Sequence, residues 1–364
     1  MAVDIAVLLK TMVQYGASDL HIRNDSKAFL RIHGDIKGID GSEMTSAEVE
    51  ALALSLMNDK SKRIYEERMA SDFSVDGGKV GRFRFNVFRQ RGKPCIAVRH
   101  IPLKIPTFAD LNLPAATLQK MALNERGLIL VTGVTGSGKT STLAAMIDHI
   151  NESCDDHIIT IEDPIEFVHR DKRSIVAQRE IGSDATDFLD ALRSAMRQDP
   201  DVILVGEMRD LETMRAAVTA AETGHLVFAT VHTMNAVQTL TRIIDLFPSH
   251  QQTQIRMQLS DTLKGILSQR LLPRCGGGRV PAMEVMIVTP HIKKLIEDNN
   301  LSGITSAIQK GAYYGMQTFN QSMVALAKSG TVTTEDVLAA ASNPDDVMLA
   351  LRGIEQESEQ HKAC

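Results

Sequence analysis

The sequence predicts an α/β chain in which a parallel-sheet domain follows a small α+β domain. From residue 117 onward, near-continuous apolar runs alternate with helical patterns, which is typical of parallel strands buried on both faces by helices. Before residue 105, apolar and polar residues alternate as in half-buried strands. Prolines keep residues 101–106 extended, so we place a linker at residues 106–116 between the two domains.

The first domain, residues 1–105, has two helical patterns and five strand patterns. The first helix is ended by Gly16, and a turn at residues 76–78 separates two of the later strands. The expected helices cover 3–15 and 46–69, and the expected strands cover 17–22, 29–32, 72–75, 81–89 and 95–100.

The second domain, residues 117–342, alternates strands and helices, and a polar tail is expected from residue 343 to residue 364. Apart from one hairpin-like stretch, its apolar runs are those of buried parallel strands. The expected order is strand 127–133, helix 139–151, strand 157–162, a hairpin-like stretch 165–178, helix 184–198, strand 201–206, helix 210–223 and strand 225–231.

A glycine-rich loop follows the first of these strands and leads into a helix. Glycines let successive backbone N–H groups face an anion at the helix N-terminus, a lysine adds a point charge, and a hydroxyl suits Mg²⁺. We therefore expect ATP phosphates on this loop and Mg²⁺ on Thr140. The candidate binding residues are Gly133, Val134, Thr135, Gly136, Ser137, Gly138, Lys139, Thr140 and Ser141.

Carboxylates follow two other strands, at the sheet edge where the loop should lie. Glu207 ends a hydrophobic strand and is the candidate to orient or deprotonate a water molecule that attacks the γ-phosphate. The preceding position, often an Asp that serves the metal, is Gly206. Glu162 and Asp163 are therefore candidate metal ligands, and Glu166 is a second catalytic candidate. The alternative is an ordinary acidic turn.

Two histidines bracket the last strand of the pattern. His232 is at its carboxyl end and is the better candidate to sense phosphate, by hydrogen bonding rather than metal ligation. His225 precedes the strand, where a structural role is an equal alternative to nucleotide binding.

Arginines cluster in the first domain. Arg82, Arg84 and Arg89 occupy one predicted strand, and Arg99 follows on the next. They form either a solvated edge or a guanidinium cluster that binds phosphate, since the guanidinium fork matches phosphate oxygens.

Composition narrows the class of protein. Forty-five acidic and 40 basic residues give a net charge of −5, which argues against direct nucleic-acid binding. The four cysteines form no CxxC pair, as expected for reduced thiols in a cytosol, and no apolar run is long enough to span a bilayer. We expect a cytoplasmic protein.

Four motifs together resemble those of the secretion ATPase superfamily, in the order of that family. They look like its Walker A, Asp-box, Walker B and His-box motifs, and a Walker B motif without Asp is usual there. The chain is most similar to the type IV pilus retraction ATPases, and Ala17-Ser18-Asp19-Leu20-His21 resembles their N-terminal signature. The four motifs occupy residues 133–142, 161–166, 197–210 and 224–233.

The resemblance implies a PAS-like N-terminal domain and a RecA-like ATPase domain. It also implies a homohexameric, Mg²⁺-dependent motor that retracts pili for twitching motility or DNA uptake, at a platform protein on the inner face of the cytoplasmic membrane. Arg84 and Arg99 would then reach a nucleotide across a subunit interface. Residues 315–321 are more similar to the accessory retraction paralogues, so a paralogous ATPase is an expected partner.

Three alternatives remain open at this stage. A pilus-assembly or type II secretion ATPase usually carries a tetracysteine zinc insertion, which this chain lacks. A RecA-like nucleic-acid translocase would share the loop and the Glu, and a noncatalytic ring subunit would bind ATP without hydrolysing it.

Overall fold

The computed structural model describes residues 4–32, 34–41, 43–101 and 104–352, with the side chain of residue 79 also left out. The chain divides into two compact units, Met1–Lys104 and Ile105–Cys364, which are described separately. Most of the polar tail predicted for residues 343–364, from residue 353 onward, lies outside the described residues.

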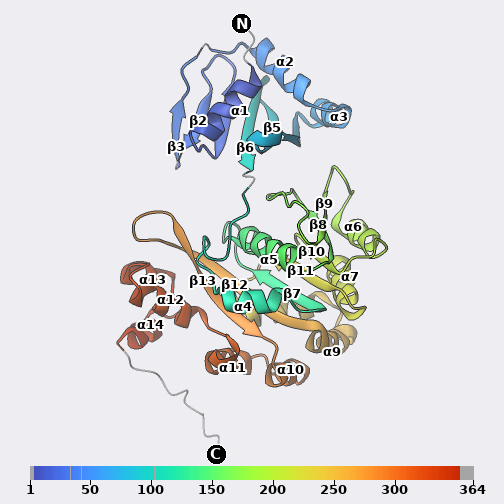
Figure 1. Cartoon of the computed structure of the whole chain (residues 1–364), viewed down its shortest axis with the longest axis vertical. Helices are drawn as coiled ribbons and strands as arrows, with labels where there is room; N and C mark the ends of the chain where they lie inside the picture. Colours follow the sequence, from blue (N-terminus) through green and yellow to red (C-terminus); the bar gives the residue numbers. More distant parts are fainter. Residues whose placement is uncertain (1–3, 33, 42, 102–103, 353–364) are drawn as a thin grey trace, which may run out of the picture. The chain divides into compact units, whose positions relative to one another are not determined.

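The first unit is a six-stranded antiparallel sheet in the order β3-β2-β1-β6-β5-β4, with helices packed on one face (Figure 1). Apolar residues of the helices, such as Met12 and Val49, share one core with Phe83 and Phe85 of β5. Its elements are α1 (Ile5–Gln14), β1 (Asp19–Arg23), β2 (Phe29–Ile32), β3 (Asp35–Gly38), α2 (Ser46–Leu56), α3 (Asp59–Arg68), β4 (Ala70–Asp76), β5 (Arg82–Gln90) and β6 (Lys93–Ile101).

The helical region predicted for residues 46–69 is two helices. Met57 is extended, and the Asn58 side chain accepts a hydrogen bond from the backbone N–H of Ser61, which makes Asn58 the N-cap of α3. An Asn at this position satisfies a helix N–H that otherwise has no partner, so a new helix starts there.

The second unit is built on a seven-stranded sheet in the order β13-β12-β7-β11-β10-β8-β9, parallel except for β13. It confirms the predicted α/β class (Figure 1). The strands are β7 (Gly127–Thr132), β8 (His157–Glu162), β9 (Ile175–Glu180), β10 (Val202–Val205), β11 (Leu226–Val231), β12 (Leu263–Pro273) and β13 (Arg279–Ile287). The helices are α4 (Ala115–Ala122), α5 (Lys139–Ser153), α6 (Phe188–Ala195), α7 (Leu211–Glu222), α8 (Ala236–Leu246), α9 (Gln252–Thr262), α10 (Pro290–Glu297), α11 (Gly303–Lys310), α12 (Phe319–Lys328), α13 (Thr334–Ala340) and α14 (Pro344–Leu351).

Hydrophobic cores cover both faces of this sheet. On β7, Ile129 and Val131 pack with α4 and α5, whereas Leu128 and Leu130 belong to the core formed with α6 to α11. Since neighbouring residues of a strand point to opposite faces, a strand between two helical layers is apolar throughout. All six residues of β7 are buried, as the sequence predicts.

Three local expectations differ from the structure. The hairpin-like stretch 165–178 is wrong: a loop of residues 163–174 crosses over to β9, which runs parallel to β8 with His157 paired to Ile175. The predicted linker 106–116 includes Phe108 and Leu113, which are buried in the core beside α4 and α5. The predicted tail from 343 begins instead with α14, whose Val347 is fully buried.

Candidate nucleotide-binding site

The glycine-rich loop lies at the carboxyl end of β7, between two fully formed elements. Gly133 and Gly138 have φ angles of +146° and +90°, a region in which side chains are strained. A Cβ atom on Gly133 would lie 2.5 Å from the backbone oxygen of Gln269, so the chain also needs glycine for space. Val134, Thr135 and Gly136 are exposed, as a loop that receives a ligand requires.

Several polar groups around this loop are placed so that they could donate hydrogen bonds to a phosphate. Lys139 is buried, and its Nζ donates to the backbone oxygens of Gly133 (2.9 Å) and Val134 (3.1 Å). The Ser137 hydroxyl is buried without a hydrogen-bond partner in the described part of the chain, and no side chain caps α5 at Gly138. Uncapped helix N–H groups, a hydroxyl and an ammonium group are the donors that bind phosphate oxygens. The residues present therefore fit a nucleotide phosphate.

The surroundings of Lys139 also change its pKa. Burial lowers the pKa of Lys139, and the negative charges of Glu207 and Glu166 oppose this by favouring the ammonium form. Both carboxylates that the sequence selected as catalytic candidates are thus close enough to act on the loop lysine.

Glu207 and His232 meet at the carboxyl ends of β10 and β11. Glu207 Oε1 lies 2.8 Å from His232 Nε2 and accepts a hydrogen bond from Arg209 Nε at 2.6 Å. The Thr230 hydroxyl donates to the backbone oxygen of Gly206 at 2.5 Å and holds the two strand ends together. The sequence predicted the Glu and the His but not Arg209 or Thr230, because only the strand order brings these four side chains together.

The pKa values of this pair favour an ionised base beside a neutral histidine. Burial alone would raise the pKa of Glu207, but the hydrogen bond from Arg209 and the positive charges of Arg209 and Lys139, joined by that of His232 when it is protonated, lower it below its usual range. Burial, followed by the charge of Lys139, lowers the pKa of His232. Near neutral pH, Glu207 can accept a proton and His232 can act as a hydrogen-bonding group.

Gly206 stands where a metal-binding Asp is often found, and the structure gives a steric reason. A Cβ atom on Gly206 would lie 3.0 Å from the backbone oxygen of Ile161 and 3.3 Å from the Glu162 Cα atom. Because β10 is this close to β8, a side chain here would require its β8 neighbours to move by a few tenths of an ångström.

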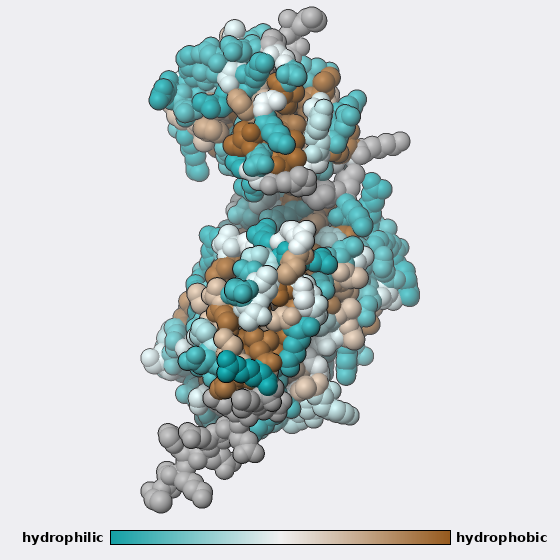
Figure 2. All heavy atoms as spheres, turned by 90° about the vertical axis from the view of Figure 1, so that its left-hand side faces the viewer, coloured by the Kyte–Doolittle hydropathy of each residue, from teal (hydrophilic) through white to brown (hydrophobic). Residues whose placement is uncertain are grey.

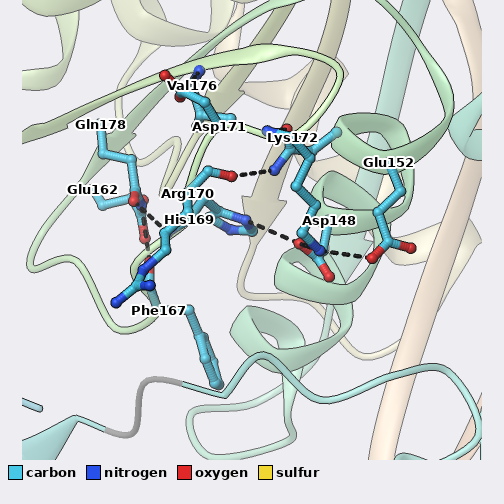
Figure 3. Close-up of polar contacts among 11 residues, drawn as sticks. Asp148, Glu152, Glu162, Phe167, His169, Arg170, Asp171, Lys172, Val176 and Gln178 are labelled. Atoms are coloured by element: carbon cyan, nitrogen blue, oxygen red, sulfur yellow. Dashed lines mark hydrogen bonds and ion pairs between the residues drawn. The ribbon is translucent and has the colours of Figure 1, made fainter. Parts of the chain in front are cut away.

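Glu162 was expected to be a metal ligand, and its environment argues against that role (Figure 3). It is buried, and its Oε1 accepts from the Thr160 hydroxyl at 2.6 Å and from Gln178 Nε2 at 3.0 Å. Burial raises its pKa. The carboxylate of Glu162 thus accepts hydrogen bonds from other buried side chains, and its role is structural.

The remaining acidic candidates differ from Glu162. Asp163 and Glu166 are exposed in the loop 163–174, and Thr140 is half-buried in the first turn of α5. Among the described residues, no three His, Cys, Asp or Glu side chains form a metal cluster. A hydroxyl ligand with few carboxylates suits Mg²⁺, which keeps several of its own waters and binds nucleotide phosphates.

The loop 163–174 is fixed by β9 and α5, as Figure 3 shows. From β9, Gln178 donates to the backbone oxygen of Phe167 (2.9 Å) and accepts from the His169 N–H (2.7 Å). From α5, the buried Asn151 donates to the backbone oxygen of Arg170 (2.8 Å) and accepts from the Lys172 N–H (3.1 Å). The sequence did not reveal these residues, since an isolated Gln or Asn carries no motif.

His225 lies at the wrong edge of the sheet for the predicted nucleotide contact. It precedes β11, and its backbone oxygen accepts from the N–H of Gly127, at the amino end of β7. Its Nδ1 is 2.9 Å from the backbone oxygen of Ala220. The phosphate loop follows the opposite end of β7, so the structural alternative holds for His225.

In the first unit, strand register decides which arginines share a face. Arg84 lies opposite Arg99 and on the same face of β5 as Arg82, whereas Arg89 has the other parity. Arg84 pairs with Asp72 at 3.5 Å and Arg99 with Asp19 at 2.9 Å. These four charged side chains line a shallow open pocket.

Arg89 has a different environment. Its NH2 atom pairs with Glu50 of α2 at 2.9 Å, and its guanidinium lies 5.3 Å from the ring centre of Tyr65. It is thus engaged by the helices and cannot substitute for Arg84.

A family model described as type II/IV secretion system protein matches residues 2–339. This chain belongs to that family. The type IV pilus retraction ATPase PilT of Pseudomonas aeruginosa is 45% identical over 343 residues, covering 94% of this chain and 99% of that protein. A crystal structure of the pilus retraction motor PilT with bound ADP has a TM-score of 0.89 at 48% identity and covers 94% of this chain and 98% of that one.

Among relatives of this secretion ATPase, the ATPase PilU of Pseudomonas aeruginosa is 39% identical, covering 95% of this chain and 90% of that protein. Identity to the PilT protein, at 45%, is higher over a similar share of the chain. Both values describe the chain as a whole, so the greater likeness of residues 315–321 to the accessory paralogues stays a prediction.

Proposed function

We propose that this chain is an ATP-hydrolysing motor that drives retraction of type IV pili. The observation that carries the proposal is the arrangement of Lys139, Glu207 and His232 at one sheet edge, in a chain similar over nearly its whole length to a pilus retraction ATPase. Hydrolysis would supply the energy for pulling, and the resulting movement would power twitching motility or DNA uptake.

The residues have distinct roles in this reaction. The loop N–H groups and Lys139 bind the outer phosphates, and ionised Glu207 orients and deprotonates the attacking water, while His232 and Arg209 hold its carboxylate in place. Mg²⁺, held by the Thr140 hydroxyl and with Asp163 as the remaining candidate carboxylate ligand, would neutralise charge on the phosphates. Glu166 is the second candidate for the base.

We further propose a homohexamer in which Arg84 and Arg99 of one subunit act on the nucleotide of a neighbour. Two adjacent guanidiniums on an open face support this role, because an arginine delivered in trans stabilises the charge that develops on the phosphoryl group. Hydrophobic residues also interrupt the polar surface of both units on the face in Figure 2, as expected for a chain that assembles.

The proposed place of action is the cytoplasmic side of the inner membrane, at a pilus platform protein and with a paralogous retraction ATPase as a further partner. Among the described residues, no helix is long and apolar enough to cross a bilayer. We assign membrane association to contact with the platform protein.

A Lys139→Ala variant tests the nucleotide site. Removing the ammonium group should abolish Mg²⁺-dependent phosphate release by the purified full-length chain, because the charge on the outer phosphates is then unmatched. Lys120→Ala, which alters an exposed lysine of α4, is the matched control and should hydrolyse ATP normally. Equal turnover by both variants would refute the assignment.

Deleting the gene and imaging labelled pili tests the cellular role. Pili that extend but fail to retract support retraction, and cells without pili would show an assembly ATPase instead. Strong salt-dependent DNA binding by the purified chain would favour the translocase alternative.

A further inference from the structure

Strand β12 lies beside the strand that ends at the phosphate loop. It pairs in parallel with β7 as far as Ser268 opposite Thr132, and the buried hydroxyls of these two residues are 3.0 Å apart. Thr132 is the last residue before the loop, so the next residue of β12, Gln269, is level with the loop itself. A residue far from the loop in the sequence is thereby placed against the nucleotide site.

Gln269 contacts both ends of the loop and the helix that follows it. Its side chain is buried, with Oε1 accepting from the Thr142 hydroxyl of α5 at 2.9 Å. If Gly138 carried a Cβ atom, that atom would lie 2.9 Å from Gln269 Nε2. A Cβ atom on Gly133 would lie 2.5 Å from the backbone oxygen of Gln269. Gln269 therefore restricts the space around Gly133 and Gly138 and makes a hydrogen bond with Thr142 in the first turn of α5.

The loop between these glycines is otherwise held by Lys139, whose ammonium group donates to the backbone oxygens of Gly133 and Val134, and by the Ser137 N–H, which donates to the backbone oxygen of Val134. Its middle residues, Val134 to Gly136, are exposed, and both end glycines have positive φ angles that allow alternative backbone paths. Phosphate binding depends on several N–H groups converging on one anion, and small misplacements of such groups are costly. Whatever fixes the ends of the loop fixes this convergence.

We propose that Gln269 is a positioning residue of the phosphate loop and sets the affinity of the site for the β- and γ-phosphates. The inference rests on the proposed nucleotide site, and it assigns a role to a β12 side chain outside the four sequence motifs. A purely structural glutamine would stabilise the fold without favouring one nucleotide over another.

The test compares ATP, ADP and AMP, with fluorescent analogues titrated into the full-length chain. Gln269→Met keeps the length of the side chain but removes the hydrogen bond to Thr142 and the amide nitrogen beside Gly138. We expect the dissociation constants for ATP and ADP to rise about 10-fold, as for the loss of one hydrogen bond, and the constant for AMP to change less than about twofold.

The matched control is Gln317→Met. The Gln317 amide donates to the backbone oxygen of Met283, the β13 residue that pairs with Gln269, so this variant loses a comparable bond on the same hairpin. It should lower the melting temperature of the protein without changing the preference for ATP over AMP.

Outcomes separate this inference from the proposed function. No ATP binding by the wild-type chain would overturn the proposed function, and wild-type binding with an unchanged ATP-to-AMP ratio in Gln269→Met would overturn this inference alone. If Gln269→Met does not fold, Gln269→Glu keeps the acceptor for Thr142 and puts a carboxylate oxygen where the amide nitrogen was. This variant should weaken ATP binding more than AMP binding. An equal effect on the two dissociation constants would again contradict a positioning role for Gln269.

Discussion

Individual side chains show why a motif identifies a site better than it identifies each member of the site. Glu207 and Glu162 both follow or end apolar strands, and the sequence marks both as candidates at the same sheet edge. The structure exposes Glu207 to Lys139 and His232, but it buries Glu162 under Thr160 and Gln178. Thr160 is a neighbour on the same strand, but Gln178 comes from β9, and no local pattern reveals that partner.

The histidines illustrate the same limit. His232 and His225 flank one strand, and which of them can reach the loop depends only on strand direction within the sheet. Parallel pairing of β11 with β7 puts His232 at the loop edge and His225 at the far edge. The sequence favoured His232 for this reason but left His225 undecided.

Replacing Glu207 with Gln tests the assignment of the base. Glu207→Gln keeps the shape and an oxygen that can accept from Arg209, but it cannot take a proton from water. We expect ATP to bind normally and hydrolysis to fall by about 10²–10⁴-fold, measured as phosphate release beside nucleotide titration. Glu166→Gln is the comparison, and a variant pair in which only Glu166→Gln is slow would mean that the base is Glu166.

At the scale of elements, the loop 163–174 was the hardest part to predict. The sequence predicted a hairpin-like stretch at 165–178, yet α5 and β9 hold this loop in a crossover that allows β9 to pair in parallel with β8. Asn151 makes four hydrogen bonds to this loop, two through its side chain and two through its backbone oxygen, which accepts from Arg173 and Ser174. Such contacts join distant residues and therefore leave no periodic pattern.

The relative importance of the two α5 contacts with this loop can be measured. Asn151→Ala removes two partly buried hydrogen bonds, to the backbone oxygen of Arg170 and from the N–H of Lys172, which should cost about 1–3 kcal/mol of local stability. Lys172→Met removes ion pairs with Asp148 and Glu152, but these are partly exposed and should contribute less than about 1 kcal/mol.

Hydrogen exchange followed by mass spectrometry on peptides covering residues 163–174 reports this local stability directly. Faster exchange in Asn151→Ala than in Lys172→Met is the expected order. The reverse order would show that the charged pairs, rather than the buried amide, hold the loop.

At the scale of the whole molecule, the sequence predicted the sheet class, most of its parallel strands and a domain change near residue 105, where the structure divides after Lys104. It assigned no strands to β12 and β13, which pair over Gly265 to Pro273 and complete the sheet. Both strands hold buried polar residues, such as Ser268 and Glu284, so neither shows the continuous apolar run from which the other buried strands were predicted. Gln269, on β12, was missed for the same reason.

The hexamer proposal makes a prediction about pairs of subunits. Arg84→Ala should be inactive alone, because an arginine supplied in trans contributes about 10³–10⁵ in rate, and Lys139→Ala should be inactive because its own loop is impaired. Mixing the two variants should recover part of the ATPase activity, since some interfaces then join an intact loop from an Arg84→Ala subunit to an intact arginine from a Lys139→Ala subunit.

The control is a mixture of Arg84→Ala with a chain that carries both substitutions, in which no interface has an intact arginine and activity should stay absent. Subunit exchange is checked by native mass spectrometry on the same samples. The register that pairs Arg84 with Arg99 predicts that Arg99→Ala behaves in the same way, because both guanidiniums lie on one face of the sheet. If exchange is complete and neither arginine variant recovers activity with Lys139→Ala, the arginines serve a solvated face of the first unit and the nucleotide site is completed within one subunit.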